Sequence, residues 1–322
     1  MVNATSTDRE LVRIALMYYE EGLTQAGIAK RVGISRSLVS KYLHDAEDAG
    51  IVRHVVNSES AYSSRLALQL EQEFGAKKAI VVDTSGIDER YVADLTQQAA
   101  VEGFMRDILQ AKVIALTWGT TIRGFVDAFP YERNAEATVV PLIGGMGSTA
   151  FEVHANQLVH DLAQKLQASC QFVYAPALVA DVEMKRSLES NGAIRSVFDV
   201  ARTADFALLG ISSPKVKNYT LKRLGYISEE DLRKLEEAGV MGDVNLSFFD
   251  RDGRPMDDVL DSRIVGLGID DIKPIEKRAT VCFVPSKTEA LYVALSSGIT
   301  NYVAMTDSIA RELLRMREKD VS

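Results

Sequence analysis

Cysteine and histidine are scarce in this chain, which has two of the first and four of the second among 322 residues. Cys170 and Cys282 lie in apolar surroundings, and neither has another cysteine or a histidine nearby at the spacing of a metal site. Both are therefore expected to be reduced thiols inside a core. The sequence predicts neither a metal site nor a cofactor.

Long apolar runs are also absent. No stretch of the sequence is long enough to cross a bilayer, and the first ten residues, MVNATSTDRE, lack the apolar segment of a secretion signal. We therefore expect a protein that does not contact membranes and that is located in the cytoplasm.

Positive charge is outnumbered, because 37 lysine and arginine residues face 45 acidic residues and the formal net charge is −8. An acidic protein should repel DNA over most of its surface. Residues 23–44 depart from this average, because they contain four lysine or arginine residues and no acidic residue. This local excess predicts one contact surface for a polyanion such as DNA.

The same stretch has the pattern of a helix-turn-helix. Thr24 can cap a first helix, and Gly33 can end it. Ser35 can cap a second helix, in which apolar residues recur at helical spacing at positions 39, 43 and 46. An ordinary helical hairpin is the alternative interpretation, and the cationic face of the second helix argues against it.

In such a motif the second helix lies in the major groove, with its N-terminal residues at the base edges. Side chains of that helix are therefore expected to contact bases, while Lys30 and Arg31, just before the turn, should contact phosphate. The sequence of residues 50–56 predicts a short β-strand that acts as a wing. The candidate DNA-binding residues are Lys30, Arg31, Ser35, Arg36, Ser37, Ser40, Lys41 and Arg53.

The length of the chain predicts about two domains. Residues 57–64, NSESAYSS, are polar and small, as is typical of a linker. We therefore expect a DNA-binding domain over residues 1–56, a linker over 57–64, and an effector-binding and oligomerisation domain over 65–322.

The second domain alternates short apolar runs with amphipathic stretches, which predicts an α/β fold with a mostly parallel sheet. The clearest predicted strands cover residues 79–82, 113–118, 138–143, 206–211, 280–284 and 302–305. Predicted helices include residues 94–109, 153–166 and 229–238.

Ligands of such sheets collect where the carboxyl ends of strands lead into helices. Four loops have suitable residues, at 118–121, 144–148, 210–213 and 285–288. In the first loop, Gly119 permits a sharp turn and two threonines stand beside free N–H groups, which would form a cradle for an anion. In the last loop, Lys287 could neutralise a phosphate.

Each loop taken singly is ordinary turn and cap chemistry. Together the four loops favour a small phosphorylated or polyhydroxylated ligand. None of them matches the phosphate-binding motif GxxxxGK[ST] or the dinucleotide-binding motif GxGxxG, so nucleotide binding is not indicated.

Seven segments, in this order, resemble the SorC family of bacterial sugar-responsive transcriptional regulators, which is also grouped with deoxyribonucleoside regulators. The resemblance covers nearly the whole chain. The segments are residues 18–25 (YYEEGLTQ), 118–121 (WGTT), 141–147 (PLIGGMG), 175–178 (APAL), 204–211 (ADFALLGI), 225–228 (GYIS) and 242–250 (GDVNLSFFD).

The resemblance implies an effector domain like the sugar-phosphate isomerase folds, with phosphate at residues 118–121 and 286–288 and the sugar near residues 156, 157, 181 and 243. The residues alone leave helix or turn capping open as the role of Asp181 and Asp243. The candidate effector-binding residues are Trp118, Gly119, Thr120, Thr121, Gly144, Gly145, Asn156, Gln157, Asp181, Asp243, Ser286, Lys287 and Thr288.

These observations predict a sequence-specific regulator of carbohydrate metabolism rather than an enzyme. Its expected partners are double-stranded operator DNA, a sugar or sugar-phosphate effector, and further copies of itself, as a dimer or, as the resemblance implies, a tetramer. The alternative is an isomerase-like enzyme fused to a DNA-binding domain, in which carboxylates at residues 181, 183 and 243 would transfer protons.

Overall fold

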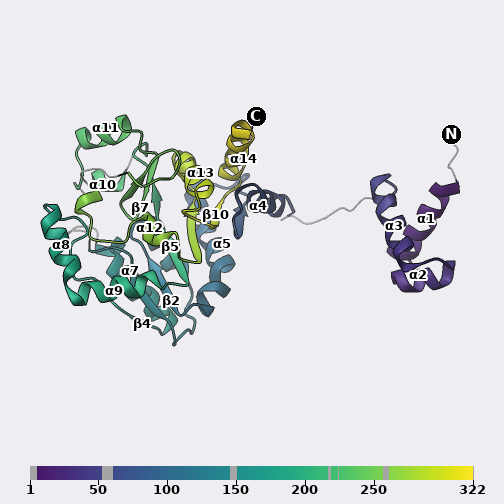
Figure 1. Ribbon diagram of the computed structural model, residues 1–322, viewed down its shortest axis with the longest axis horizontal. Coiled ribbons are helices and arrows are strands. Elements are labelled where there is room, and N and C mark those ends of the chain that lie inside the picture. Colours follow the sequence, from purple (N-terminus) through teal and green to yellow (C-terminus); the bar gives the residue numbers. More distant parts are fainter. Residues whose placement is uncertain are drawn as a thin grey trace. The chain divides into compact units, whose positions relative to one another are not determined.

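The computed structural model describes residues 6–52, 61–145, 151–216, 219–223, 225–256 and 261–321. The chain divides into two compact units, Met1–Ala61 and Tyr62–Ser322, whose elements are labelled in Figure 1. None of the helices in the described residues combines the length and the apolar character needed to cross a membrane.

The first unit contains three helices in its described part, α1 (Ser6–Tyr19), α2 (Gln25–Val32) and α3 (Arg36–Asp48). They pack around a small apolar core of Ile14, Met17, Ile28, Val39 and Leu43. The α3 residues of this core lie on one face of the helix, which leaves its other face to solvent. The predicted pair of helices is thus confirmed, and α1 packs against the same core.

The predicted caps of the helix pair are also confirmed. The side chain of Thr24 accepts a hydrogen bond from the N–H of Gly27, and that of Ser35 accepts one from the N–H of Leu38. Gly33 ends α2 with a φ of 76°, a left-handed conformation that glycine adopts without strain. These caps fix the length of the turn that joins the two helices.

The segment between the units differs in part from the prediction. Helix α4 begins at Ala61, so its first turn occupies the last four residues of the predicted linker 57–64. The predicted wing over residues 50–56 lies largely outside the described residues, which stop at Val52 before Arg53.

The second unit is built on a seven-stranded parallel sheet and a three-stranded antiparallel sheet. The strands are β1 (Lys78–Val82), β2 (Val113–Leu116), β3 (Thr138–Pro141), β4 (Ser169–Cys170), β5 (Phe206–Leu209), β6 (Ile211–Ser212), β7 (Gly242–Val244), β8 (Ser247–Phe249), β9 (Lys277–Cys282) and β10 (Tyr302–Thr306). The α-helices are α4 (Ala61–Phe74), α5 (Glu89–Gln110), α6 (Thr120–Ala128), α7 (Ala155–Leu166), α8 (Val182–Ser190), α9 (Gly192–Arg202), α10 (Thr220–Arg223), α11 (Glu229–Glu237), α12 (Ile269–Ile272), α13 (Thr288–Ser296) and α14 (Asp307–Val321). Three short 3-10 helices, η1 (Phe151–Val153), η2 (Asp261–Arg263) and η3 (Pro285–Lys287), complete the described elements.

Helices cover both faces of the large sheet. Buried residues of α5, α6 and α7 pack on one face, and those of α4, α9, α13 and α14 pack on the other. Successive strand residues alternate between the two cores, as Ala207 and Leu208 do in β5. The predicted α/β fold is therefore confirmed, and it is of the doubly wound type.

The order of strands in the large sheet is β1-β10-β9-β5-β2-β3-β4. From β2 the chain runs outward through β3 to β4, and it then returns to place β5 on the other side of β2 before continuing to β9 and β10. The direction of winding therefore reverses between β2 and β5. In sheets of this kind, the reversal opens a crevice at the carboxyl ends of the two strands.

One region predicted as a single strand is divided between the two sheets. The predicted strand 206–211 is divided at Gly210, where the chain leaves the large sheet and enters the small one as β6. The N–H of Gly210 bonds to Oγ1 of Thr117 at 2.8 Å. A Cβ at Gly210 would lie 3.1 Å from the carbonyl oxygen of Trp118, so glycine permits this close crossing.

Candidate functional site

The outer face of α3 in the first unit is polar and exposed. Arg36, Ser37, Ser40 and Lys41 are all exposed there, on the side of the helix away from the core. Ser35 caps the helix and its hydroxyl lies 2.9 Å from that of Ser37. The structure therefore brings the predicted base-reading side chains together at the N-terminal half of one helix.

The two predicted phosphate-contacting residues lie in the last turn of α2. Lys30 is exposed. Arg31 is also exposed and forms an ion pair with Glu21, with 2.5 Å between Nη1 and Oε2. Such exposed pairs contribute at most about 1 kcal/mol, so a phosphate can replace Glu21 at little cost.

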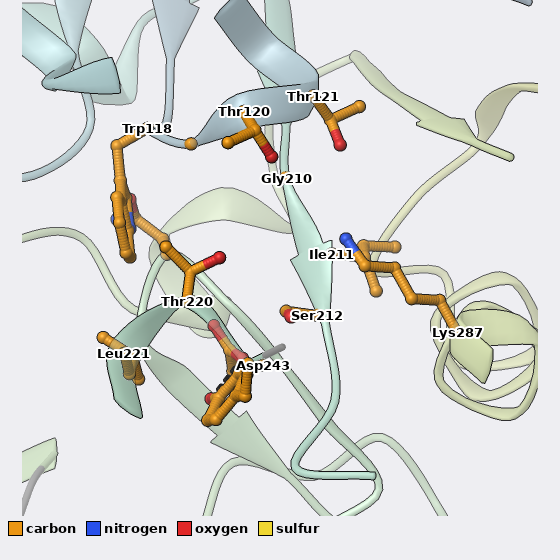
Figure 2. Close-up of a pocket in the computed structure, with 13 residues that line it drawn as sticks. Trp118, Thr120, Thr121, Gly210, Ile211, Ser212, Thr220, Leu221, Asp243 and Lys287 are labelled. Atoms are coloured by element: carbon orange, nitrogen blue, oxygen red, sulfur yellow. Dashed lines mark hydrogen bonds between the residues drawn. The ribbon is translucent and has the colours of Figure 1, made fainter. Parts of the chain in front are cut away.

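In the second unit a pocket lies at the point where the winding reverses, and Figure 2 shows its lining side chains. The space between its lining atoms, counted together with the open solvent at its mouth, is about 460 Å³. Three of the four loops predicted to bind ligand contribute to it, since residues 118–121, 210–212 and Lys287 follow β2, β5 and β9 respectively. These three strands are neighbours in the large sheet. The expected convergence at their carboxyl ends is thus present.

One side of the pocket has unused donors at the start of α6. Gly119, which precedes this helix, has φ 117° and ψ 171°, values that favour glycine, and no side chain caps the helix. The N–H of Arg123 bonds to the carbonyl of Gly119. In the described structure the N–H groups of Thr120, Thr121 and Ile122 therefore have no backbone acceptor. These groups, with the positive end of the helix dipole, favour an anion.

Lys287 enters the same pocket from η3 (Figure 2). Its ammonium forms no hydrogen bond or ion pair with any residue that the structure describes. Burial lowers the pKa of Lys287, while Cys282 and Asp243 oppose that shift. A partly dehydrated cation without a partner makes this side of the pocket more attractive to an anion.

The opposite side of the pocket presents hydrogen-bond acceptors. Asp243 in β7 is 5% exposed and accepts a hydrogen bond of 2.7 Å from the hydroxyl of Tyr219. Burial raises the pKa of Asp243 to about 6, and the Tyr219 hydroxyl and the charge of Lys287 oppose this rise. A carboxylate held in this way can accept hydrogen bonds from a ligand's hydroxyl groups.

Asn245 lines the pocket as well, and the sequence reasoning did not single it out. Asn245 and Leu246 form the two-residue turn between β7 and β8, with φ values of 57° and 65°. The Nδ2 of Asn245 donates to the carbonyl oxygens of Leu142 and Leu267, at 2.9 Å each. Its Oδ1 is buried and has no partner among the described residues. The side chain is therefore held as an acceptor.

Other lining residues that the sequence reasoning missed come from the segment after β6. They are Tyr219, Thr220 and Leu221, and their place beside Asp243 depends on the antiparallel pairing of β6 with β7. A sequence signal was present for Asn245, because it lies in the segment 242–250 on which the family resemblance rests. The segment around residue 220 carried no such signal.

Several predicted effector-binding residues do not line this pocket. Gly144 and Gly145 pack against the chain at residues 175–177, where a Cβ on Gly144 would lie 2.6 Å from the carbonyl oxygen of Ala175. Met146–Ala150, the rest of that loop, lie outside the described residues. The described pair therefore has a packing role, and the close backbone crossing requires glycine at position 144.

The two amides predicted on α7 have partners of their own. Asn156 exchanges two hydrogen bonds with the backbone of Val173, at 3.0 and 3.1 Å. Gln157 donates to Asp161 at 2.7 Å. Neither residue lines the pocket at the reversal point.

Asp181 caps α8, since its side chain accepts a hydrogen bond of 2.8 Å from the N–H of Met184. This is the capping alternative that the sequence left open. Asp181 is exposed and lies outside the lining of the pocket. Of the two aspartates considered as sugar ligands, the structure therefore brings only Asp243 to the pocket.

Ser286 and Thr288 flank Lys287 in sequence but line a different groove, with Lys215, Glu289 and Met316 among its other residues. The hydroxyl of Thr288 donates to the carbonyl of Pro285 at 2.7 Å. The predicted loop 285–288 thus contributes its lysine to the pocket, and its two hydroxyl residues lie on the other side of η3.

Comparison with known proteins gives matches for both units. Residues 58–315 match a family model described as "Putative sugar-binding domain", and residues 5–53 match a "Homeodomain-like domain". The sorbitol operon regulator of Klebsiella pneumoniae is 26% identical over 95% of this chain and 98% of its own length. The deoxyribonucleoside regulator of Bacillus subtilis is 23% identical over 94% and 96%, respectively.

Solved structures give the same result. The full-length sorbitol operon regulator of Klebsiella pneumoniae superposes with a TM-score of 0.75 at 26% identity, covering 95% of this chain and 98% of that one. A DeoR family transcriptional regulator from Listeria monocytogenes superposes with a TM-score of 0.74 at 33% identity, covering 78% of this chain and 99% of that one. The likeness extends over both the helical unit and the α/β unit in the first case.

A pH profile tests the environment of Asp243. Because the folded-state pKa of Asp243 is raised from 3.8 to about 6, its contribution to stability is present below pH 3.8 and is lost as the pH rises through about 6. Asp243→Asn has no such charge to bury. Relative to wild type, its free energy of unfolding should therefore increase between pH 4 and 7 by about 2–3 kcal/mol.

Urea unfolding of the ligand-free protein at pH 4, 5, 6 and 7, in buffers without phosphate, measures this difference. Asp94→Asn, at an exposed position of α5, is the matched control. Its free energy of unfolding should change with pH in the same way as that of wild type. A parallel profile for Asp243→Asn would show that the carboxyl group is not buried as described.

Proposed function

The chain belongs to the SorC family of sugar-binding transcriptional regulators, and we propose that a small phosphorylated sugar, bound in the pocket at the reversal point, controls its affinity for operator DNA. The observation that carries this proposal is the position of Lys287. Its ammonium, which has no partner among the described residues, shares one pocket with the N–H groups at the start of α6, which have no acceptor among them either. A phosphate group neutralises the ammonium and accepts hydrogen bonds from the N–H groups at the same time.

The two sides of the pocket fit the two ends of such a ligand. Phosphate oxygens accept hydrogen bonds from the backbone N–H groups of Thr120, Thr121 and Ile122 at the start of α6, and they interact with Lys287. Sugar hydroxyls donate to Asp243 and Asn245, which are acceptors on the opposite side. A free sugar satisfies the acceptors but leaves the cationic side without a partner.

The first unit supplies the DNA contact. In the proposed complex the N-terminal half of α3 lies in the major groove, where Arg36, Ser37, Ser40 and Lys41 reach base edges. Lys30, and Arg31 once released from Glu21, contact phosphate groups on the DNA. The protein then acts in the cytoplasm, where the DNA of a bacterial cell lies.

Control of DNA binding follows from linkage. A ligand that binds more tightly to one arrangement of the protein shifts the population toward it by the ratio of its two affinities. If the two arrangements place the reading heads differently, the same ratio changes operator affinity. Paired reading heads bind half-sites about one helical turn apart, so a dimer or tetramer is the proposed assembly.

A binding role accounts for the pocket better than catalysis does. Proton transfer on a sugar phosphate needs an acid and a base within reach of the same carbon atoms. Among the described lining residues Asp243 is the one carboxylate. Asp181 and Glu183 belong to the start of α8, outside the lining.

A ligand screen tests the proposal directly. The melting temperature of the full chain is measured with pairs of free and phosphorylated sugars, because a ligand that binds only the native state raises it by mass action. A phosphosugar should raise it where its free sugar does not. The same phosphosugar should then change binding to an operator selected from random duplexes. Stabilisation by free polyols alone would contradict the anion site.

Lys287→Ala should abolish the response to the phosphosugar and leave operator binding intact, because the substitution removes the cation and not the reading head. Fluorescence anisotropy of the labelled operator, with and without ligand, measures both quantities. Lys215→Ala is the matched control, since Lys215 is exposed and pairs with Glu289 in the neighbouring groove. A normal response in Lys287→Ala would remove this lysine from the site.

Arg36→Ala should relax sequence preference at one operator position and cost ~1–3 kcal/mol there, because its side chain is proposed to contact a base edge. Lys30→Ala should weaken binding to all sequences equally and flatten the salt dependence. Anisotropy titrations over operator variants and salt concentrations separate the two effects. Full operator selectivity in Arg36→Ala would overturn its assignment.

A further inference from the structure

Gln97 is a buried polar residue at a position of α5 where an apolar residue is expected. Apolar residues at 101, 104 and 108 recur at helical spacing from it and belong to the core on that face of the sheet. Gln97 itself is only 4% exposed. A long amide in this stripe requires a specific reason, because burying polar groups opposes folding.

The contacts of Gln97 lead to α6. Its Nε2 donates a hydrogen bond of 3.0 Å to the carbonyl oxygen of Thr121, in the first turn of that helix. Gly124, one turn further on, allows the approach, because a Cβ there would lie 3.0 Å from the same nitrogen. The amide of Gln97 therefore contacts the backbone of α6 in the turn to which the lining residues Thr120 and Thr121 belong.

Stability does not explain this arrangement. A single hydrogen bond contributes about 0.5–1.5 kcal/mol net, whereas a buried polar atom without a partner costs about 1–3 kcal/mol. The Oε1 of Gln97 is such an atom in the described structure. The two effects leave the buried amide neutral or destabilising compared with an apolar side chain of the same shape.

The peptide group whose carbonyl oxygen accepts this hydrogen bond from Gln97 also contains an N–H group. The carbonyl of Thr121 and the N–H of Ile122 belong to one peptide unit, and this N–H is among the free donors at the start of α6. A donor on the carbonyl side polarises the unit and strengthens its N–H as a donor. It also fixes the orientation of the peptide plane. Second-layer contacts of this kind determine how well groups in direct contact with a ligand perform.

We infer that Gln97 is a positioning residue for the anion: by holding the Thr121 carbonyl, it orients and polarises the Ile122 N–H that receives the negatively charged group of the effector. The inference rests on the proposed function, because it requires an anion at the start of α6. It adds a residue that lies outside the pocket lining and belongs to a different helix.

Gln97→Met in the full chain tests the inference, with inorganic phosphate as the probe. Methionine has a similar length and keeps the apolar contacts but removes the donor. The dissociation constant for phosphate should increase about three- to tenfold, as expected for the loss of one hydrogen bond. The melting temperature without phosphate should stay the same or rise. Phosphate titrations at constant ionic strength, followed by thermal unfolding, measure both.

Gln98→Met is the matched control, because the neighbouring glutamine is exposed and should change neither quantity. Gln97→Leu serves as a second variant if the first does not fold. A purely structural role predicts a lower melting temperature with unchanged phosphate affinity. That result would overturn the inference about Gln97 and leave the proposed function standing. If wild type does not bind phosphate, or binds it equally in Lys287→Ala, the proposed anion site fails and the inference fails with it.

Discussion

The reversal of strand order between β2 and β5 is the constraint on which the rest of the second unit depends. After these two neighbouring parallel strands, the chain continues in opposite directions along the sheet. No single connection then covers both carboxyl ends, so a crevice remains open there. The first turn of α6 follows one strand and the crossing at Gly210 follows the other. The pocket lies beyond the close crossing of these two segments, and Lys287 enters it from the loop after the next strand, β9.

Electrostatics then determines what the pocket favours. Burial opposes the charged forms of both Lys287 and Asp243, which are attracted to each other. The two charges do not form an ion pair with each other. Asp243 accepts its hydrogen bond from Tyr219, and Lys287 has no close partner among the described residues. A ligand with an anionic end and a hydroxylated end supplies what each side lacks. Its binding energy therefore depends strongly on both ends being present.

The helix that presents the free N–H groups is itself positioned from behind. Gly124 brings α5 within contact of α6, and Gln97 uses that contact to reach the backbone of the first turn. An apolar residue would serve the core as well, so the amide indicates that backbone orientation matters at this point. Orientation is also fixed at the turn at Asn245, where two residues in the left-handed backbone conformation hold the side-chain acceptor in one direction.

The sequence by itself determined the features that depend on neighbours along the chain. The caps at Thr24 and Ser35 and the end of α2 at Gly33 each involve hydrogen bonds over three or four residues, so local patterns were sufficient. Alternation of strands and helices likewise predicted an α/β fold with a mostly parallel sheet. Tertiary structure decided which loops meet, because strand order places residues 118–121, Gly210 and Lys287 together while leaving Asn156 and Gln157 with other partners. It also decided that Asp243 rather than Asp181 enters the pocket, since burial and the contact with Tyr219 arise only when distant segments pack.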